Sequence, residues 1–286
     1  MEVIQRSTDF LARKGVESPR LQVELLLAHV LRVPRLQLYL NFERTLAKTE
    51  LEAIRGLVKR RGSREPLQHI VGATSFCGLE IAVSPDVLVP RPETELLAEK
   101  AWCHLQALAG RGSDRLTALD FGTGSGCLAL ALAAHCPAVE VCAVDISPAA
   151  LAVAQENARR HKLSERIRFL AGDGFAALPP GLRFDLLVAN PPYIPSGDIP
   201  HLQPEVRDHD PRTALDGGPD GLEFYRRLAR EAPAFLQVAG RAMLELGNGQ
   251  AEPVQEIFAA HKWIVERIEA DYTGRLRFLT ARVAPC

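Results

Sequence analysis

The sequence predicts an α/β protein whose main domain holds a doubly wound, mostly parallel sheet, preceded by a helical bundle and a short hairpin. Strand and helix patterns alternate from residue 116 onward, which is typical of such a sheet. Residues 1–68 show helical spacing without strand alternation. Residues 69–89 mix β-branched residues with Gly and Pro, as in a hairpin linker. We therefore expect a helical domain at 1–68, a hairpin linker at 69–89 and an α/β domain at 90–286.

Two helix starts are indicated within the helical domain. Ser18 and Pro19 form an N-cap followed by proline at the first helical position. Thr49 to Glu52 has the capping-box pattern before a second helix. Residues 1–70 contain 13 Lys and Arg against 8 Asp and Glu, and Arg55 to Arg64 supply much of this excess. A solvated helix face is one interpretation of this basic run, and contact with an RNA-bound partner is another.

The α/β domain is expected to alternate strands and helices through to its end. A helix should begin near Pro92, where acidic residues follow a proline. The segment from Ile194 to Asp220 is long and rich in Pro and Asp, and loops of that size are usually functional. The expected strands are 116–121, 139–145, 167–171, 184–189, 241–246 and an antiparallel pair at 263–270 and 276–283; the expected helices are 127–135, 147–161, 221–236 and 251–261.

Composition is that of an ordinary globular protein. The 286 residues are 47% hydrophobic and 24% charged, with a net charge of −1. No apolar run approaches the ~20 residues of a membrane span, and the amphipathic N-terminus lacks a signal-peptide core. The six cysteines show no C-x-x-C pair or metal-ligand spacing, so we expect buried thiols, no metal and a cytoplasmic location.

The strand predicted at 184–189 runs directly into Asn190-Pro191-Pro192-Tyr193. Proline cannot donate to a ladder and holds the preceding residue extended, so the carbonyls of Asn190 and Pro191 are left unpaired. The carboxyl ends of strands in such sheets are where ligands bind. Oxygen acceptors and an aromatic ring, without a basic or nucleophilic group, suit a substrate –NH₂. A simple strand-ending turn is the alternative reading.

A glycine-rich turn, Asp120-Phe121-Gly122-Thr123-Gly124-Ser125-Gly126, joins the first strand of the sheet to the next helix. Its G-x-G-x-G spacing lacks the third glycine of a dinucleotide fingerprint, because Cys127 stands there, and no G-K-[ST] of a P-loop follows. Asp145 ends the following strand, where a carboxylate accepts hydrogen bonds from both hydroxyls of a ribose. The pattern favours a nucleoside without phosphates, such as S-adenosylmethionine. Asp173 is an adenine-edge contact or only a turn residue.

Together, these residues resemble a class I S-adenosylmethionine-dependent methyltransferase with a Rossmann-like sheet, acting on a planar amino or amide nitrogen. Pro90 to Glu95, Glu205 to Leu215 and Gly217 to Arg226 narrow the likeness to the HemK/PrmC glutamine methyltransferases. The resemblance implies N5 methylation of the Gly-Gly-Gln glutamine of peptide-chain release factors, docked on the helical domain. The cofactor site it implies comprises Gly122, Thr123, Gly124, Ser125, Gly126, Asp145, Ile146, Asp173, Gly174, Phe175 and Asn190.

The same resemblance implies how the substrate is handled. Asn190 Oδ1 and the Pro191 carbonyl would each accept one N–H of the glutamine amide, while Tyr193 packs on the amide plane. Pro192, Arg91 and Glu95 complete the expected substrate contacts. The family often has an aromatic residue directly after the acid of the third strand, whereas Gly174 stands there and Phe175 follows, which leaves the adenine-packing residue open.

Two alternatives use the same motif. Methylation of a ribosomal-protein glutamine would need only a different docking domain. Adenine-N6 methylation of nucleic acid would require a basic groove, yet residues 190–223 carry 7 acidic against 2 basic side chains. A non-catalytic binding protein with this fold would have no need of the intact acceptor set. We therefore expect a protein substrate, no direct nucleic-acid substrate and no membrane partner.

Overall fold

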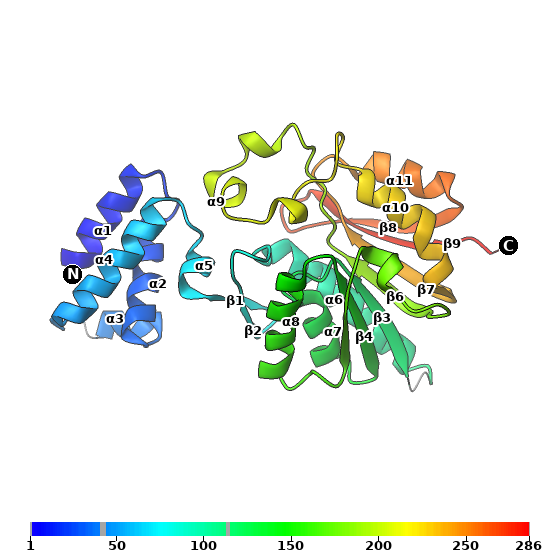
Figure 1. Ribbon diagram of the computed structural model, residues 1–286, viewed down its shortest axis with the longest axis horizontal. Helices are drawn as coiled ribbons and strands as arrows, with labels where there is room; N and C mark the ends of the chain where they lie inside the picture. The colour runs from blue at the N-terminus through cyan, green and yellow to red at the C-terminus, as the bar shows by residue number, and fades with distance from the viewer. Residues whose placement is uncertain (1, 41–43, 113–114, 286) are drawn as a thin grey trace. The chain divides into compact units, whose positions relative to one another are not determined.

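A computed structural model describes residues 2–40, 44–112 and 115–285 (Figure 1). Cys286, one of the six predicted thiols, lies outside these ranges. The chain forms two compact units, one of residues 1–73 together with 202–209, the other of residues 74–201 and 210–286. In the described ranges, no helix is both long and apolar enough to cross a membrane. The five described cysteines are free thiols; Cys136 and Cys142 are buried, but Cys103 is exposed.

The first unit is helical, as predicted. Leu11, Leu26 and Ile54 are fully buried at its centre. Two predicted start signals differ in detail: the Ser18 side chain makes no capping bond, and the helix expected after a capping box at Thr49 to Glu52 begins at Lys48, with Ala47 at the N-cap position. There the Glu50 carboxylate accepts a 2.9 Å hydrogen bond from the N–H of Ala47. The helices are α1 (Glu2–Arg13), α2 (Pro19–Leu31), α3 (Arg35–Leu40), α4 (Lys48–Gly62), α5 (Leu67–Val71) and α9 (Pro204–Arg207).

The basic end of α4 is paired inside this unit. Arg61 Nη2 donates to Glu205 Oε1 at 2.6 Å, and Arg64 donates to both oxygens of Glu205 at 2.6 Å. Arg60 pairs with Glu65. Burial disfavours ionisation of Glu205, but the two arginines outweigh it and lower its pKa to about 2. Residues 202–209 therefore belong to the helical unit through these ion pairs, although they lie some 140 positions further along the chain.

The second unit contains a seven-stranded sheet of order β5-β4-β3-β6-β7-β9-β8. Strands β3 to β7 run parallel, and β9 is antiparallel to both of its neighbours, as predicted for the last two strands. The strands are β3 (Leu116–Phe121), β4 (Val139–Asp145), β5 (Ile167–Ala171), β6 (Phe184–Ala189), β7 (Leu236–Glu245), β8 (Trp263–Ala270) and β9 (Leu276–Val283).

Helices cover both faces of the sheet (Figure 1). One face carries α6 (Pro92–Ala109), α7 (Cys127–His135) and α8 (Pro148–Arg160); the other carries α10 (Glu223–Glu231) and α11 (Ala251–Ala260). Alternate residues of β6 enter the two cores: Leu186 and Val188 face one, Leu187 and Ala189 the other. A strand buried on both sides explains why 184–189 is continuously apolar.

Short elements connect these layers. The hairpin is β1 (Ala73–Phe76) and β2 (Leu79–Ala82), after α5, so its strands occupy the middle of the predicted linker. The helix predicted over 221–236 ends at Glu231 and continues as a 3₁₀ turn, η4 (Ala232–Phe235), because Pro233 has no N–H for a continuing helix. Strand β7 begins five residues before its predicted start. The other 3₁₀ turns are η1 (Gly174–Ala177), η2 (Ile199–His201) and η3 (Arg212–Ala214).

We predict that Glu205→Ala loosens the helical unit locally. Losing charged hydrogen bonds of this kind costs about 1.5–3 kcal/mol. Hydrogen exchange should therefore accelerate at the end of α4 and across 202–209. Glu156→Ala is the matched control, because Glu156 also pairs with two arginines but on an exposed helix face, where such pairs contribute ~0–1 kcal/mol. Because the Glu205 pKa is lowered, its contribution should be present above about pH 4.5 and disappear as the pH falls toward 2. Equal exchange in the two variants would contradict this account.

Candidate active site

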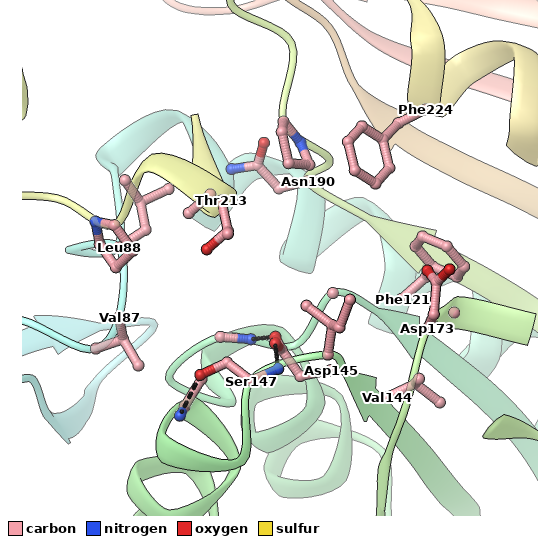
Figure 2. A pocket seen from close by; sticks show the side chains of 18 of the residues that line it. Val87, Leu88, Phe121, Val144, Asp145, Ser147, Asp173, Asn190, Thr213 and Phe224 are labelled. Atoms are coloured by element: carbon pink, nitrogen blue, oxygen red, sulfur yellow. Dashed lines mark hydrogen bonds between the residues drawn. The ribbon is translucent and has the colours of Figure 1, made fainter. Parts of the chain in front are cut away.

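The predicted site residues gather at the carboxyl end of the parallel strands. The chain runs from β3 outward through β4 to β5 and then returns to the other side of β3 as β6. Ligands bind at such a reversal in strand order. A cavity opens there (Figure 2). Of the predicted site residues, it is lined by Gly122, Gly124, Asp145, Ile146, Asp173, Gly174, Asn190 and Pro192.

The glycine turn and Asp145 form one wall of this cavity. Gly122 and Gly124 have φ of 75° and 55°, which favour glycine. Asp145 Oδ2 accepts from the N–H of Gly124 at 2.8 Å, and Oδ1 accepts from the N–H of Ser147 at 2.9 Å (Figure 2). The carboxylate is thus held in one orientation, and each oxygen keeps acceptor capacity for a ligand hydroxyl. Thr123, Ser125 and Gly126 do not line the cavity and instead shape the turn.

A buried carboxylate lies beneath the glycine turn. Asp120 Oδ2 accepts from the Thr123 hydroxyl at 2.6 Å and from the N–H of Ala129 at 3.1 Å. Asp120 Oδ1 is buried and has no hydrogen-bond partner among the described residues. Burial raises the Asp120 pKa to about 7, with the nearby Asp145 charge adding to the shift and the two hydrogen bonds opposing it. An unpaired carboxylate oxygen at this depth is a site of negative potential that a nearby cation would stabilise.

Aromatic side chains form another part of the cavity wall. Phe121 and Phe224 line the cavity, whereas Phe175 lies behind Phe121, with ring centroids 4.9 Å apart. Phe175 is 4% exposed and does not reach the cavity. A Cβ on Gly174 would lie 2.7 Å from the Phe121 ring. Because Phe121 already fills the space that a side chain at 174 would need, the aromatic surface on this side is provided by Phe121 and Phe224.

Asp173 is paired with an arginine of α10. Arg227 pairs with its carboxylate and donates a 2.9 Å hydrogen bond to its carbonyl. Arg227 itself lines the cavity, as do Leu88, Thr213 and Ala214. The sequence analysis did not identify these four residues. Only their place in segments of the HemK/PrmC pattern or in loops beside the strand ends could have indicated them.

The turn after β6 keeps its acceptors available. Asn190 lies across the cavity from Asp145 (Figure 2). Within the described parts of the chain, neither Asn190 Oδ1 nor the Pro191 carbonyl accepts a hydrogen bond. The Tyr193 ring does not line this cavity. Burial raises the Tyr193 pKa to about 12, with the Glu245 charge adding to the shift, so the phenol is neutral.

Two glycines support this turn from behind. A Cβ on Gly217 would lie 2.8 Å from Tyr193 Cα and 2.9 Å from the Pro192 carbonyl. A Cβ on Gly221 would come still closer to the Tyr193 carbonyl oxygen, which also accepts a 2.9 Å hydrogen bond from Gln250 Nε2. The stretch after Gly217 is thus packed directly against the backbone that presents the acceptors.

The predicted substrate residues Arg91 and Glu95 lie outside the cavity. Arg91 pairs with Asp210 at 2.6 Å, which ties the start of α6 to the loop after β6. Glu95 lines a separate hollow with Glu93, Trp102 and Tyr272. Neither residue therefore belongs to the same cavity wall as Asn190, and their contact with a substrate stays a prediction.

Comparison with known proteins identifies the family. Residues 2–72 match the PrmC N-terminal domain, and residues 103–201 match the methyltransferase small domain. A release factor glutamine methyltransferase of Geobacter sulfurreducens is 48% identical over 90% of this chain and 87% of its own length. The chain belongs to the release factor glutamine methyltransferase family. Another member, from Chlorobaculum tepidum, is 45% identical over 88% of this chain and 87% of its own length.

A solved structure of low sequence identity shares the fold. A methyltransferase from Pyrococcus furiosus superimposes with a TM-score of 0.51 at 21% identity, covering 71% of this chain and 88% of its own. Family and fold confirm the predicted class I methyltransferase architecture.

We predict that Gly217→Ala destabilises the turn that carries Asn190. The added methyl would have to push the Pro192–Tyr193 backbone, and overpacking of this kind costs about 1–3 kcal/mol. Thermal unfolding should shift down by about 2–4 °C per kcal/mol. Gly197→Ala, in the same loop with open space around its Cβ, should unfold near the wild-type temperature. A Gly217→Ala melting temperature equal to that of Gly197→Ala would show that the contact is not tight.

Proposed function

We propose that this protein transfers a methyl group from S-adenosylmethionine to the side-chain amide nitrogen, N5, of the glutamine in the Gly-Gly-Gln motif of peptide-chain release factors. The observation that carries the proposal is the pair of acceptors that follow β6: Asn190 Oδ1, on a residue that lines the cavity, and the carbonyl of the adjacent buried Pro191, neither of which accepts a hydrogen bond within the described residues. An –NH₂ group has two N–H donors for that pair. Relatives named release factor glutamine methyltransferases support the choice of a glutamine amide.

The cavity residues fit the cofactor. Asp145 would accept from the ribose hydroxyls, and Phe121 and Phe224 offer apolar faces for a purine. The unpaired Asp120 Oδ1 beneath the glycine turn suits a ligand whose sulfonium and ammonium groups are positive. When bound, the cofactor supplies an electrophilic methyl group. Gly122 and Gly124 would let the cofactor lie close against the backbone of the turn.

The residues of this chain orient a weak nucleophile. An amide lone pair is delocalised into its carbonyl, so reaction requires the nitrogen to be held in line with the methyl group. Acceptance of both N–H groups by Asn190 and Pro191 would fix that orientation and stabilise positive charge as it develops on nitrogen. Positioning of this kind can lower a barrier by roughly 7–11 kcal/mol in favourable cases. An N-methylated amide cation loses its proton readily, so no strong base is required.

The alternative substrates are distinguished by family and docking. Adenine-N6 methylation shares the Asn-Pro-Pro-Tyr motif, but the relatives of this chain are named release factor glutamine methyltransferases, and the two basic side chains of residues 190–223, Arg207 and Arg212, are both paired with carboxylates. A ribosomal-protein glutamine would use the same acceptors. The helical first unit, which matches the PrmC N-terminal domain, supports a release factor as the docked partner. A release-factor substrate implies action in the cytoplasm.

The direct test uses isotopically labelled S-adenosylmethionine and purified release factor. We expect one methyl group on the Gly-Gly-Gln glutamine, located by tandem mass spectrometry. Asn190→Ala should bind S-adenosylmethionine within about twofold of wild type yet lose most transfer, because the proposed ribose and purine contacts of Asp145, Phe121 and Phe224 are kept while the acceptor for the substrate amide is removed. Gly197→Ala serves as the control for preparation and folding. Methylation of a ribosomal protein or of DNA in preference to release factor would overturn the proposal.

The cofactor site should also show a linked protonation. The Asp120 pKa of about 7 means that roughly half the free protein holds a proton there at pH 7. Binding of a cation favours the ionised carboxylate, so affinity should rise from pH 6 to pH 8, with release of up to roughly half a proton at pH 7. Calorimetry in buffers of different ionisation enthalpy measures that release.

Asp120→Asn should abolish the proton release while keeping an oxygen that can accept from Thr123. Asp173→Asn, which changes an exposed carboxylate at the same cavity, should leave it unchanged. An Asp120→Asn variant that still releases the same number of protons would exclude Asp120 as the linked group.

A further inference from the structure

We propose that Thr94 and Glu245 are positioning residues that turn the Asn190 side-chain amide so that its oxygen faces the substrate. The proposal rests on the function proposed above and extends it to residues behind the site. Asn190 Nδ2 donates to Thr94 Oγ1 at 3.1 Å, and the Thr94 hydroxyl donates to Glu245 Oε2 at 2.7 Å. These two bonds form a chain that starts at the end of β7 and finishes at the cavity.

This hydrogen-bond chain lies in the interior of the protein. Thr94 and Glu245 are each only 2% exposed, so water has little access to either side chain. Glu245 is the last residue of β7, next to β6 in the sheet, and Thr94 lies in the first turn of α6. A second contact holds this end of β7, because the buried Tyr225 hydroxyl donates to the Glu245 carbonyl at 2.9 Å. A buried carboxylate at this position requires a compensating partner, and Thr94 provides one.

The number of available protons determines which group donates and which accepts in this hydrogen-bond chain. A threonine hydroxyl has one proton, and an ionised Glu245 can only accept. The Thr94 proton is therefore committed to Glu245, and Thr94 Oγ1 can only accept from Asn190. The amide must then present its NH₂ group to Thr94 and its oxygen to the opposite side. A freely rotating amide would offer the glutamine a donor for part of the time, which would repel its N–H groups.

The ionisation state of Glu245 is accordingly part of the arrangement. Burial raises the Glu245 pKa to about 7, opposed by the Thr94 hydrogen bond and by the charges of Arg277 and Arg91, while Glu93 adds to the shift. The phenols of Tyr193 and Tyr225 also lie beside it, and burial raises the pKa of both, so both are neutral. A protonated Glu245 would be able to donate to Thr94 Oγ1. The Thr94 hydroxyl would then be able to donate to the Asn190 amide oxygen, so that every hydrogen bond in the series would run in the opposite direction.

A purely structural role makes different predictions. Thr94 could simply anchor the first turn of α6 to the sheet, in which case its removal would lower stability and activity independently of Asn190. A double-mutant cycle separates the two roles, because residues that act through one another are not additive. Thr117→Val is the matched control, since the Thr117 hydroxyl also contacts a carboxylate, that of Asp185 at 3.2 Å, near the opposite end of the sheet.

The experiment measures kcat, KM for release factor and S-adenosylmethionine affinity for Thr94→Val, Thr94→Ser and Thr117→Val. We expect Thr94→Val to lower kcat by about tenfold or more, with cofactor affinity within about twofold. Thr94→Ser, which restores the hydroxyl, should recover most of the loss. On an Asn190→Ala background, Thr94→Val should cause no further loss. A further loss of the same size there, or no loss in Thr94→Val alone, would overturn the proposal.

Glu245→Gln adds a pH readout. In wild type, kcat should decline as the pH falls through about 7, because protonation of Glu245 reverses the chain. In Glu245→Gln the decline should be absent. An unchanged decline in this variant would show that another group titrates.

An NMR readout keeps this proposal separate from the proposed function. The Asn190 side-chain NH₂ signals, identified by their loss in Asn190→Ala, should exchange slowly in wild type and faster in Thr94→Val. Slow exchange with no methyl transfer to any release factor would overturn the proposed function and leave the positioning chain standing. Equal exchange of the Asn190 NH₂ signals in wild type and Thr94→Val would overturn the proposed hydrogen-bond chain.

Discussion

Two consecutive prolines end β6 at the carboxyl edge of the sheet, and this constraint shapes the rest of the site. Neither Pro191 nor Pro192 can donate a backbone hydrogen bond, so the ladder stops after Ala189, the last paired residue of the strand. Among the described residues, nothing donates a hydrogen bond to Asn190 Oδ1 or to the Pro191 carbonyl, beside the reversal in strand order. The turn after β6 is held by packing and by an ion pair instead of by strand pairing. Gly217 and Gly221 pack against its backbone, and Arg91 pairs with Asp210 in the loop that follows.

Two buried carboxylates lie behind the residues that line the cavity. Asp120 lies under the glycine turn and Glu245 lies behind Asn190, and burial raises the pKa of each to about 7. In both cases desolvation outweighs the hydrogen bonds that favour the charged form. Such burial is costly for stability, so these carboxylates are better explained by what they do to their neighbours. In the roles proposed above, Asp120 supplies negative potential for a cationic ligand, and Glu245 accepts the hydrogen bond that the Thr94 hydroxyl donates.

Much of this arrangement could be predicted because it is local in sequence. Strands β3 to β6 end where the apolar pattern ends; Gly122 and Asn190 directly follow β3 and β6, and Asp145 is the last residue of β4. Contacts between distant segments could not be predicted in this way. The chain from Glu245 through Thr94 to Asn190 joins three segments, and no single stretch contains its pattern. The pairing of Glu205 with the basic end of α4 has the same character.

Packing explains why the adenine-side aromatic could not be assigned from the sequence. Position 174 is glycine because Phe121, from the end of β3, already occupies the adjacent space. Phe175 then turns inward to pack between Phe121 and Phe235. A pattern of residue types records that an aromatic is present, whereas only the fold shows which one reaches the cavity.

The most direct test of the central claim is a crystal structure with S-adenosylhomocysteine and a release factor, or its Gly-Gly-Gln peptide. The account predicts that the glutamine amide nitrogen lies about 2.7–3.2 Å from both Asn190 Oδ1 and the Pro191 carbonyl oxygen, with the Asn190 NH₂ group still bonded to Thr94. A glutamine amide held by other groups, with Asn190 rotated away from Thr94, would contradict it.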